Sequence, residues 1–439
     1  MRPNRSPAWL RNKTTLKESK VKLNGLVLGL ALAGLTGHGM AAESLFTETS
    51  NRAVFAEPGE LLRLVTADPA NANIDIVNAN ADLISDRTQE LALRLPGGID
   101  VKASLSSFER MESGNEVWTG QISLGSKPGA LPENDISPLL NNIIAVRSGD
   151  TILANIRVAG QLYRLAPIER GLHALVEVDE SKFLVDETEA AYDEMVRNSS
   201  PVREAATSER PEPEGESRAI STIRVMVAFG PAATAAIGNE QQAVDLAFAE
   251  ANQALAATNT DARFQQAGAI QFYTQSETTN YSTMLTRLTS LSDGYYDAIG
   301  GQRNTNAADM VAYFAPASST LCGQAAAIAA TSTRAYFVMS PNCISGNFTF
   351  VHEAGHVVGA RHDNDPTTSP YAYGHGYVIA SQNRRTVMAV NNGPCSTCTR
   401  IGAFSSPSYT TGGVPIGTAS FNDNTRVWRT RGPTVAAFR

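Results

Sequence analysis

Three histidines and a glutamate in one short segment constrain this chain more than any other feature. The segment that begins at Val351 and ends at Asp363 reads VHEAGHVVGARHD. His352 and His356 are four residues apart, so on a helix both imidazoles leave the same face about one turn apart. Two nitrogens placed in this way can reach one metal ion about 2 Å from each of them. The segment therefore predicts a helix that presents two metal ligands.

The rest of the segment predicts a catalytic site. Glu353 follows the first histidine and can approach a water at the metal without being a ligand. Gly359 can take the positive φ that ends a helix, and the resulting turn brings His362 back as a third ligand. Three neutral histidines leave one position open for water, which is typical of catalytic zinc. We predict one catalytic Zn²⁺ on His352, His356 and His362, with Glu353 as general base.

An alternative to an enzyme is an exported zinc-binding adhesion or toxin-like protein with little enzymatic activity. Such a protein would use the fold for contact and would have no need of a general base. The presence of Glu353 favours the enzyme. The sequence does not decide whether calcium is also required.

The chain begins with the parts of an export signal. Lysines at positions 17, 20 and 22 precede an apolar run from Leu23 to Leu35, and small residues follow up to Ala42. The run is too short for a comfortable membrane helix, and no apolar run of spanning length follows it. We expect residues 1–42 to be a signal peptide. The protein would then be secreted, either extracellular or periplasmic, with no membrane segment in its mature form.

The remaining 397 positions divide into three parts by pattern. Residues 43–197 alternate apolar and polar positions between Gly and Pro turns, as in Glu90–Leu95, which is typical of β-strands. Residues 198–218 are rich in Pro, Glu and Ser and predict an exposed linker. Residues 219–439 carry the histidine segment. We predict a precursor whose β-rich propeptide domain inhibits the domain that follows the linker.

Charge is distributed unevenly between these parts. Residues 43–217 hold 30 acidic and 15 basic side chains, whereas residues 218–439 hold 12 acidic and 14 basic ones, all of them Arg. The two regions attract each other over distance, as expected of an inhibitory segment on an enzyme, although an acidic surface also simply keeps a protein soluble. The formal net charge of −7 argues against a nucleic-acid partner.

The four cysteines predict two disulfides. They are Cys322, Cys343, Cys395 and Cys398. An even number in an exported chain reads as paired cysteines, and three pairings are possible. Proximity in sequence favours Cys322 with Cys343 and Cys395 with Cys398. A four-cysteine zinc site is the alternative, and the wide spacing of the first pair disfavours it.

The second half alternates predicted strands and helices, which indicates an α/β layered domain. A buried strand is expected at 223–229 and a helix at about 240–257. A strand near 269–273 and a helix near 283–291 follow, and then strands at 309–314 and 335–339.

The motif HExxHxxGxxHD resembles the metzincin clan of zinc endopeptidases, and Asp363 after the third histidine is similar to the adamalysin (reprolysin) branch. Segments such as Leu321-Cys322-Gly323 and Tyr373 to Tyr377 resemble bacterial peptidyl-Asp metalloendopeptidases and reprolysin-like relatives. The resemblance covers about residues 220–439. It implies a metzincin-type α/β (α+β) catalytic domain with a twisted mixed sheet, a long zinc-binding helix, a small irregular part after Gly359 and a helix near the C-terminus.

The resemblance also implies protein or peptide substrates, and it assigns roles to single residues. Met388 stands where the clan has a methionine-containing turn beneath the zinc. If cleavage occurs on the amino side of Asp, a cation is needed in the pocket for the residue after the cut. Arg400 is our candidate, with Arg384 and Arg385 as weaker ones. His375 is a further ligand candidate, with a structural role preferred.

Latency by a cysteine of the propeptide domain is excluded. No cysteine occurs before Cys322. The inhibitory ligand expected instead is an acidic residue of 43–217.

Overall fold

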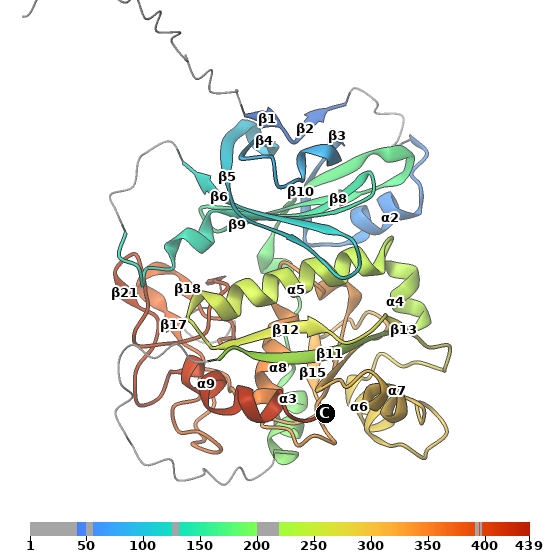
Figure 1. Ribbon diagram of the computed structural model, residues 1–439, viewed down its shortest axis with the longest axis vertical. Helices are drawn as coiled ribbons and strands as arrows, with labels where there is room; N and C mark the ends of the chain where they lie inside the picture. Colours follow the sequence, from blue (N-terminus) through green and yellow to red (C-terminus); the bar gives the residue numbers. More distant parts are fainter. Residues whose placement is uncertain (1–41, 50–55, 125–130, 200–218, 391–394, 396) are drawn as a thin grey trace, which may run out of the picture. The chain divides into compact units, whose positions relative to one another are not determined.

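The computed structural model describes residues 42–49, 56–124, 131–199, 219–390, 395 and 397–439 (Figure 1). The predicted signal peptide and most of the predicted linker lie outside the described residues. None of the helices in the described part is both long enough and apolar enough to span a membrane.

The first half of the described chain forms a ten-stranded sheet in the order β1-β4-β5-β6-β7-β8-β9-β10-β3-β2. All neighbours are antiparallel except β1 and β4. The strand predicted at Glu90–Leu95 is β4, in which Leu91, Leu93 and Leu95 face the core and the residues between them do not. The alternation thus sets which face of the sheet is buried. The bounds are β1 Glu43–Ser44, β2 Phe46–Glu48, β3 Asn71–Ala79, β4 Glu90–Leu95, β5 Ile99–Arg110, β6 Glu116–Ser123, β7 Asn142–Ser148, β8 Thr151–Val158, β9 Gln161–Pro167 and β10 His173–Val178.

The second half is built on a six-stranded sheet in the order β12-β11-β14-β16-β15, with β13 also paired to β11. Strands β11, β14 and β16 are parallel and almost wholly buried, as expected of strands covered on both faces. The edge strand β15 runs antiparallel to β16. The bounds are β11 Ser221–Phe229, β12 Ala262–Gln266, β13 Gln271–Phe272, β14 Met310–Phe314, β15 Gly323–Ala325 and β16 Tyr336–Met339.

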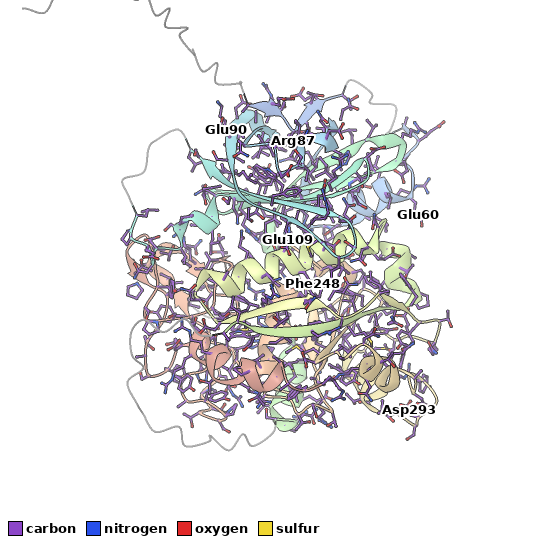
Figure 2. The ribbon with its side chains drawn as sticks, in the orientation of Figure 1. Glu60, Arg87, Glu90, Glu109, Phe248 and Asp293 are labelled. Atoms are coloured by element: carbon purple, nitrogen blue, oxygen red, sulfur yellow. A yellow bond between two sulfur atoms is a disulfide. The ribbon has the colours of Figure 1, made fainter. Side chains whose placement is uncertain are left out.

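Helix α5 (Glu240–Ala257) lies between the two sheets (Figure 1). Asn239 caps its start by accepting a hydrogen bond from the Gln242 amide at 3.0 Å. On one side Leu246 packs in a cluster with apolar residues of β6 and β7. On the other, Phe248 (labelled in Figure 2) has its ring centroid 5.0 Å from that of Phe350. Because α5 is buried on two sides, its sequence is apolar around most of its circumference.

Most of the remaining helices contact the second sheet, whereas α2 contacts β3 of the first sheet. The motif helix α8 (Thr349–Val358) contacts β15 and β16, and α9 (Asn424–Val435) contacts β11 and β12. The others are α2 Glu60–Ala67, α3 Glu189–Arg197, α4 Pro231–Ala236, α6 Tyr281–Thr289 and α7 Ile299–Thr305. Short strands complete the part after α8: β17 Val378–Ile379, β18 Arg384–Arg385, β19 Thr399–Arg400, β20 Thr410–Thr411 and β21 Val414–Pro415.

Helix α3 belongs to the first half by sequence and packs on the second half. The side chain of Met195 in α3 lies in the main apolar cluster of the second half. The Met195 carbonyl accepts a hydrogen bond from the Ile328 amide at 3.3 Å. Residues 42–439 accordingly form one compact unit. The segment between β10 and α3 crosses from one sheet to the other, and it passes the histidines on the way.

Candidate metal centre

The three histidines of the motif meet at their Nε2 atoms. These atoms are 3.1 Å apart for His352 and His356, and 3.2 Å apart for each of these with His362. Helix α8 supplies the first two rings, and Gly359, with a φ of 122°, ends the helix so that the chain turns back to His362. A residue with a side chain is strained at that φ.

The rings are oriented so that lone pairs converge. His352 Nδ1 donates to the Val387 carbonyl and His356 Nδ1 donates to the Ala360 carbonyl, both at 2.9 Å. A neutral imidazole with its proton on Nδ1 has a lone pair on Nε2. Several lone pairs at about 3 Å from one another repel unless a cation lies among them. Nitrogens about 2 Å from one tetrahedral zinc ion would be spaced by about 3.3 Å, so the donor set fits zinc.

A carboxylate from the first half of the chain lies beside the three histidines. The Glu187 carboxylate lies 3.1 Å from His352 Nε2, 3.0 Å from His356 Nε2 and 3.1 Å from His362 Nε2. The four residues are all buried, and together they form a cluster able to hold a metal ion. The carboxylate thus lies close to all three nitrogens.

The turn beneath the cluster is supported by Met388. Met388 is fully buried, and a Cβ added to Gly355 of α8 would lie 2.7 Å from its sulfur. Asp363 holds the same turn, because its Oδ1 accepts a hydrogen bond from the Val390 amide at 2.9 Å. This turn also places the Val387 carbonyl where it accepts a hydrogen bond from His352 Nδ1.

Glu353 is buried beside the cluster with both carboxylate oxygens unpartnered among the described residues. Burial, followed by the charges of Glu187 and Asp186, raises the pKa of Glu353 well above its ordinary value. Its carboxylate lies against β15, where a Cβ added to Gly323 would be 2.5 Å from Oε1. Glu353 is therefore held between the edge strand and the cluster.

Comparison with known proteins identifies this arrangement. Residues 220–405 match the family model described as metallo-peptidase family M12. A protein of Stenotrophomonas maltophilia named peptidyl-Asp metalloendopeptidase is 38% identical over 429 residues, covering 94% of this chain and 97% of the relative. One of the same name from Xanthomonas campestris pv. campestris is 37% identical over 388 residues, covering 88% and 89%.

The chain belongs to metallo-peptidase family M12. It is a zinc metalloendopeptidase, and the expected resemblance and mixed α/β fold class are confirmed.

In this metallopeptidase, Arg400 lies next to the cluster and has a partner from the first half. Its guanidinium donates to both carboxylate oxygens of Asp186, with Nη1 2.9 Å from Oδ1. Burial opposes ionisation of Asp186, but the charges of Arg400 and His352 and the hydrogen bonds from Arg400 together outweigh it and lower the pKa of Asp186 to about 2. The weaker candidates differ: Arg385 is buried and bonded to backbone carbonyls, whereas Arg384 is half-buried and bonded to Gln382 and Thr411.

Tyr192 of α3 covers the third histidine of the metallopeptidase. Its ring stacks on His362 with a centroid distance of 4.1 Å, and its hydroxyl donates to Asp365 at 2.7 Å. Together with Glu187 it encloses the cluster from the side of the first half.

Two further expectations concern His375 and the cysteines. The His375 ring stacks on Phe421 at 3.9 Å and is not part of the four-residue cluster. The disulfides join Cys322 with Cys343 and Cys395 with Cys398, the pairing that proximity favoured.

Sequence reasoning did not single out Glu187, Asp186, Tyr192 or Gly323. The expectation of an acidic inhibitory ligand within 43–217 left 30 candidates. The one local signal is Thr188, which caps α3 by accepting from the Ala191 amide at 3.3 Å and so places an acidic pair just before a helix start.

Proposed function

We propose that the chain is a secreted zinc endopeptidase that cleaves on the amino side of Asp, with Glu353 as general base, and that it is made as a latent precursor. The observation that carries this proposal is the convergence of three Nε2 lone pairs beside a buried carboxylate without a hydrogen-bond donor. His352, His356 and His362 would hold the ion.

The chain's own residues supply orientation and proton transfer. When bound, zinc makes a water nucleophilic near neutral pH and polarises the carbonyl under attack. The carbonyls of Val387 and Ala360 fix two of the imidazole rings and their tautomers. Glu353 takes a proton from the attacking water as the C–O bond forms, and returns it to the leaving nitrogen as the C–N bond breaks.

The preference for Asp is supported by the names of the two relatives and by Arg400. Both relatives are called peptidyl-Asp metalloendopeptidase. A guanidinium that already holds an Asp side chain beside the cluster offers a carboxylate two parallel hydrogen bonds.

Secretion and latency have separate support. Secretion is supported by the predicted signal peptide and the two disulfides, which persist in oxidising compartments. Latency is supported by Glu187 at the three histidines and by Tyr192 over His362. A substrate carbonyl cannot reach the cluster while the Glu187 carboxylate is there.

Mass spectrometry of the products from a denatured protein mixture tests the function. The full chain is expressed, and the active enzyme that it yields is incubated with the mixture, with and without a chelator, and with zinc added back. Cuts concentrated before Asp, lost with the chelator and restored by zinc, are expected. Cuts before apolar residues would refute the Asp preference, and zinc-loaded protein without cuts would favour a binding role.

Gly323→Ala is expected to lower kcat/KM by about 10- to 100-fold, because the new Cβ would fall 2.5 Å from the Glu353 carboxylate and displace it. Gly301→Ala on α7 is the matched control, since a Cβ there meets nothing within 4 Å. Peptide kinetics on both variants at equal zinc content measure the effect. Full activity of the Gly323→Ala variant would show that Glu353 can act as general base without a glycine at position 323.

A further inference from the structure

The salt bridge between Arg400 and Asp186 is buried and lies beside the metal cluster. Arg400 and Asp186 are 3% and 5% exposed. Arg400 Nη1 also donates to the Asn347 carbonyl at 2.8 Å, so the guanidinium is held in one orientation. The next residue, Glu187, reaches the three histidines. Two consecutive acidic side chains thus contact the two charged features of this region: Asp186 binds Arg400, and Glu187 lies at the three histidines.

Removal of the first half would leave this region short of negative charge. Arg385 pairs with Arg400 in adjacent strands β18 and β19. Burial and the Arg400 charge lower the pKa of Arg385 to about 9, and Asp186, Glu180 and Asp363 are the carboxylates that oppose this. Asp186 and Glu180 precede the predicted linker, and only Asp363 follows it. A buried cation without its partner is costly, so the processed enzyme gains by binding a carboxylate here.

The backbone around Asp186 runs along the edge strand of the second sheet. The Val185 carbonyl accepts from the Cys322 amide at 2.8 Å, and the Asp186 carbonyl accepts from the Gly323 amide at 3.1 Å. Val185 and Leu321 form a parallel bridge. An extended peptide added to an open sheet edge is a common mode of peptide recognition.

The direction of this segment distinguishes it from a substrate. Here the residue after the Asp, Glu187, lies at the histidines. In a substrate cut on the amino side of Asp, the residue before the Asp contributes the carbonyl that is attacked. With its Asp in the same place, a substrate must therefore run along β15 in the opposite, antiparallel direction.

We propose that Arg400 is the residue that selects Asp after the scissile bond, and that Asp186-Glu187 inhibits as a substrate mimic bound in reverse. Asp186 fills the specificity pocket, while Glu187 puts a side-chain carboxylate where a substrate would place its carbonyl. The inference rests on the proposed endopeptidase function and adds to it the origin of its specificity.

Two peptides that differ only in Asp or Asn after the cleaved bond test the role of Arg400. The ratio of kcat/KM for Asp over Asn is expected to fall by about 100-fold in Arg400→Gln, with partial recovery in Arg400→Lys. Arg384→Gln is the control. Arg384 is the residue before Arg385 in β18, and its side chain bonds Gln382 and Thr411 instead of Asp186, so this variant should keep the wild-type ratio. All measurements use the active enzyme obtained from the full chain.

A peptide with the sequence of residues 183–190 tests the mimicry. It should inhibit competitively, and an Asp186→Asn version should inhibit the wild-type enzyme at least about 10-fold more weakly. On the Arg400→Gln enzyme the two versions should be equal. If Arg400→Gln does not fold, equal inhibition of the wild type by both peptides overturns the proposal.

The outcomes separate the two proposals. A wild-type enzyme without preference for Asp over Asn overturns the proposed substrate class. A wild-type preference that Arg400→Gln retains overturns the assignment of Arg400 and leaves the endopeptidase function standing.

Discussion

Replacing Glu353 by Gln is expected to lower kcat/KM for peptide hydrolysis by about 1,000-fold while zinc stays bound, because general acid–base catalysis contributes about 10²- to 10⁴-fold. Glu353 supplies no atom to the four-residue cluster, so the affinity for the metal should not depend on it. Gln has nearly the same shape, and it cannot accept the proton of the attacking water.

Steady-state kinetics and metal analysis of the same samples measure both quantities. Glu240→Gln, in the first turn of α5, is a matched carboxylate-to-amide control and should keep wild-type activity. Retained turnover in the Glu353 variant at equal zinc content would mean that another group takes the proton. Loss of zinc together with activity would show instead that Glu353 supports the metal site.

Replacing Glu187 by Ala is expected to raise the activity of the intact, unprocessed chain by about 100-fold, since a buried charged contact of this kind is worth about 2–5 kcal/mol. The Glu187 carboxylate is the group of the first half that lies within 3.0–3.1 Å of all three Nε2 atoms. Its removal opens the position that a substrate needs. Glu187→Gln should give a smaller increase, because its amide oxygen remains a weak ligand.

Initial rates on a peptide substrate, taken before any cleavage within 198–218, measure this effect. Glu189→Gln is the control, because that side chain is exposed at the start of α3. An intact Glu187→Ala chain as inactive as the wild type would assign latency to another contact, first of all the stacking of Tyr192 on His362. Mass spectrometry of each sample establishes that the chain is intact.

The local patterns of the second half predicted most of its elements. The helix predicted at about 240–257 is α5, Glu240–Ala257, because its apolar positions recur at helical spacing and Asn239 caps it. Strands β14 and β16 fall within the apolar runs that predicted them, and β11 begins two residues before its predicted run. The strand predicted near 269–273 is the two-residue β13, but other short elements were not predicted. Strand β15 has only three residues, and its pairing with β16 rather than its own pattern makes it a strand.

The domain boundaries remain predictions, but α3 shows why a boundary drawn from composition can mislead. The predicted first part ends at 197, and the change to Pro, Glu and Ser after it is abrupt. Yet Met195 of α3 packs in the apolar cluster of the second half. Composition shows where a chain stops burying apolar surface, and it does not show which core an element joins.

The sequence by itself determined the metal chemistry, because that chemistry is local. His352, Glu353 and His356 lie within one turn of a helix, and Gly359 returns the chain to His362 within a few residues. Only the tertiary structure decided what faces that site. Glu187 meets His352 across 165 positions and Asp186 meets Arg400 across 214. Contacts at such separations depend on how two sheets pack around α5, and no spacing in the sequence records them.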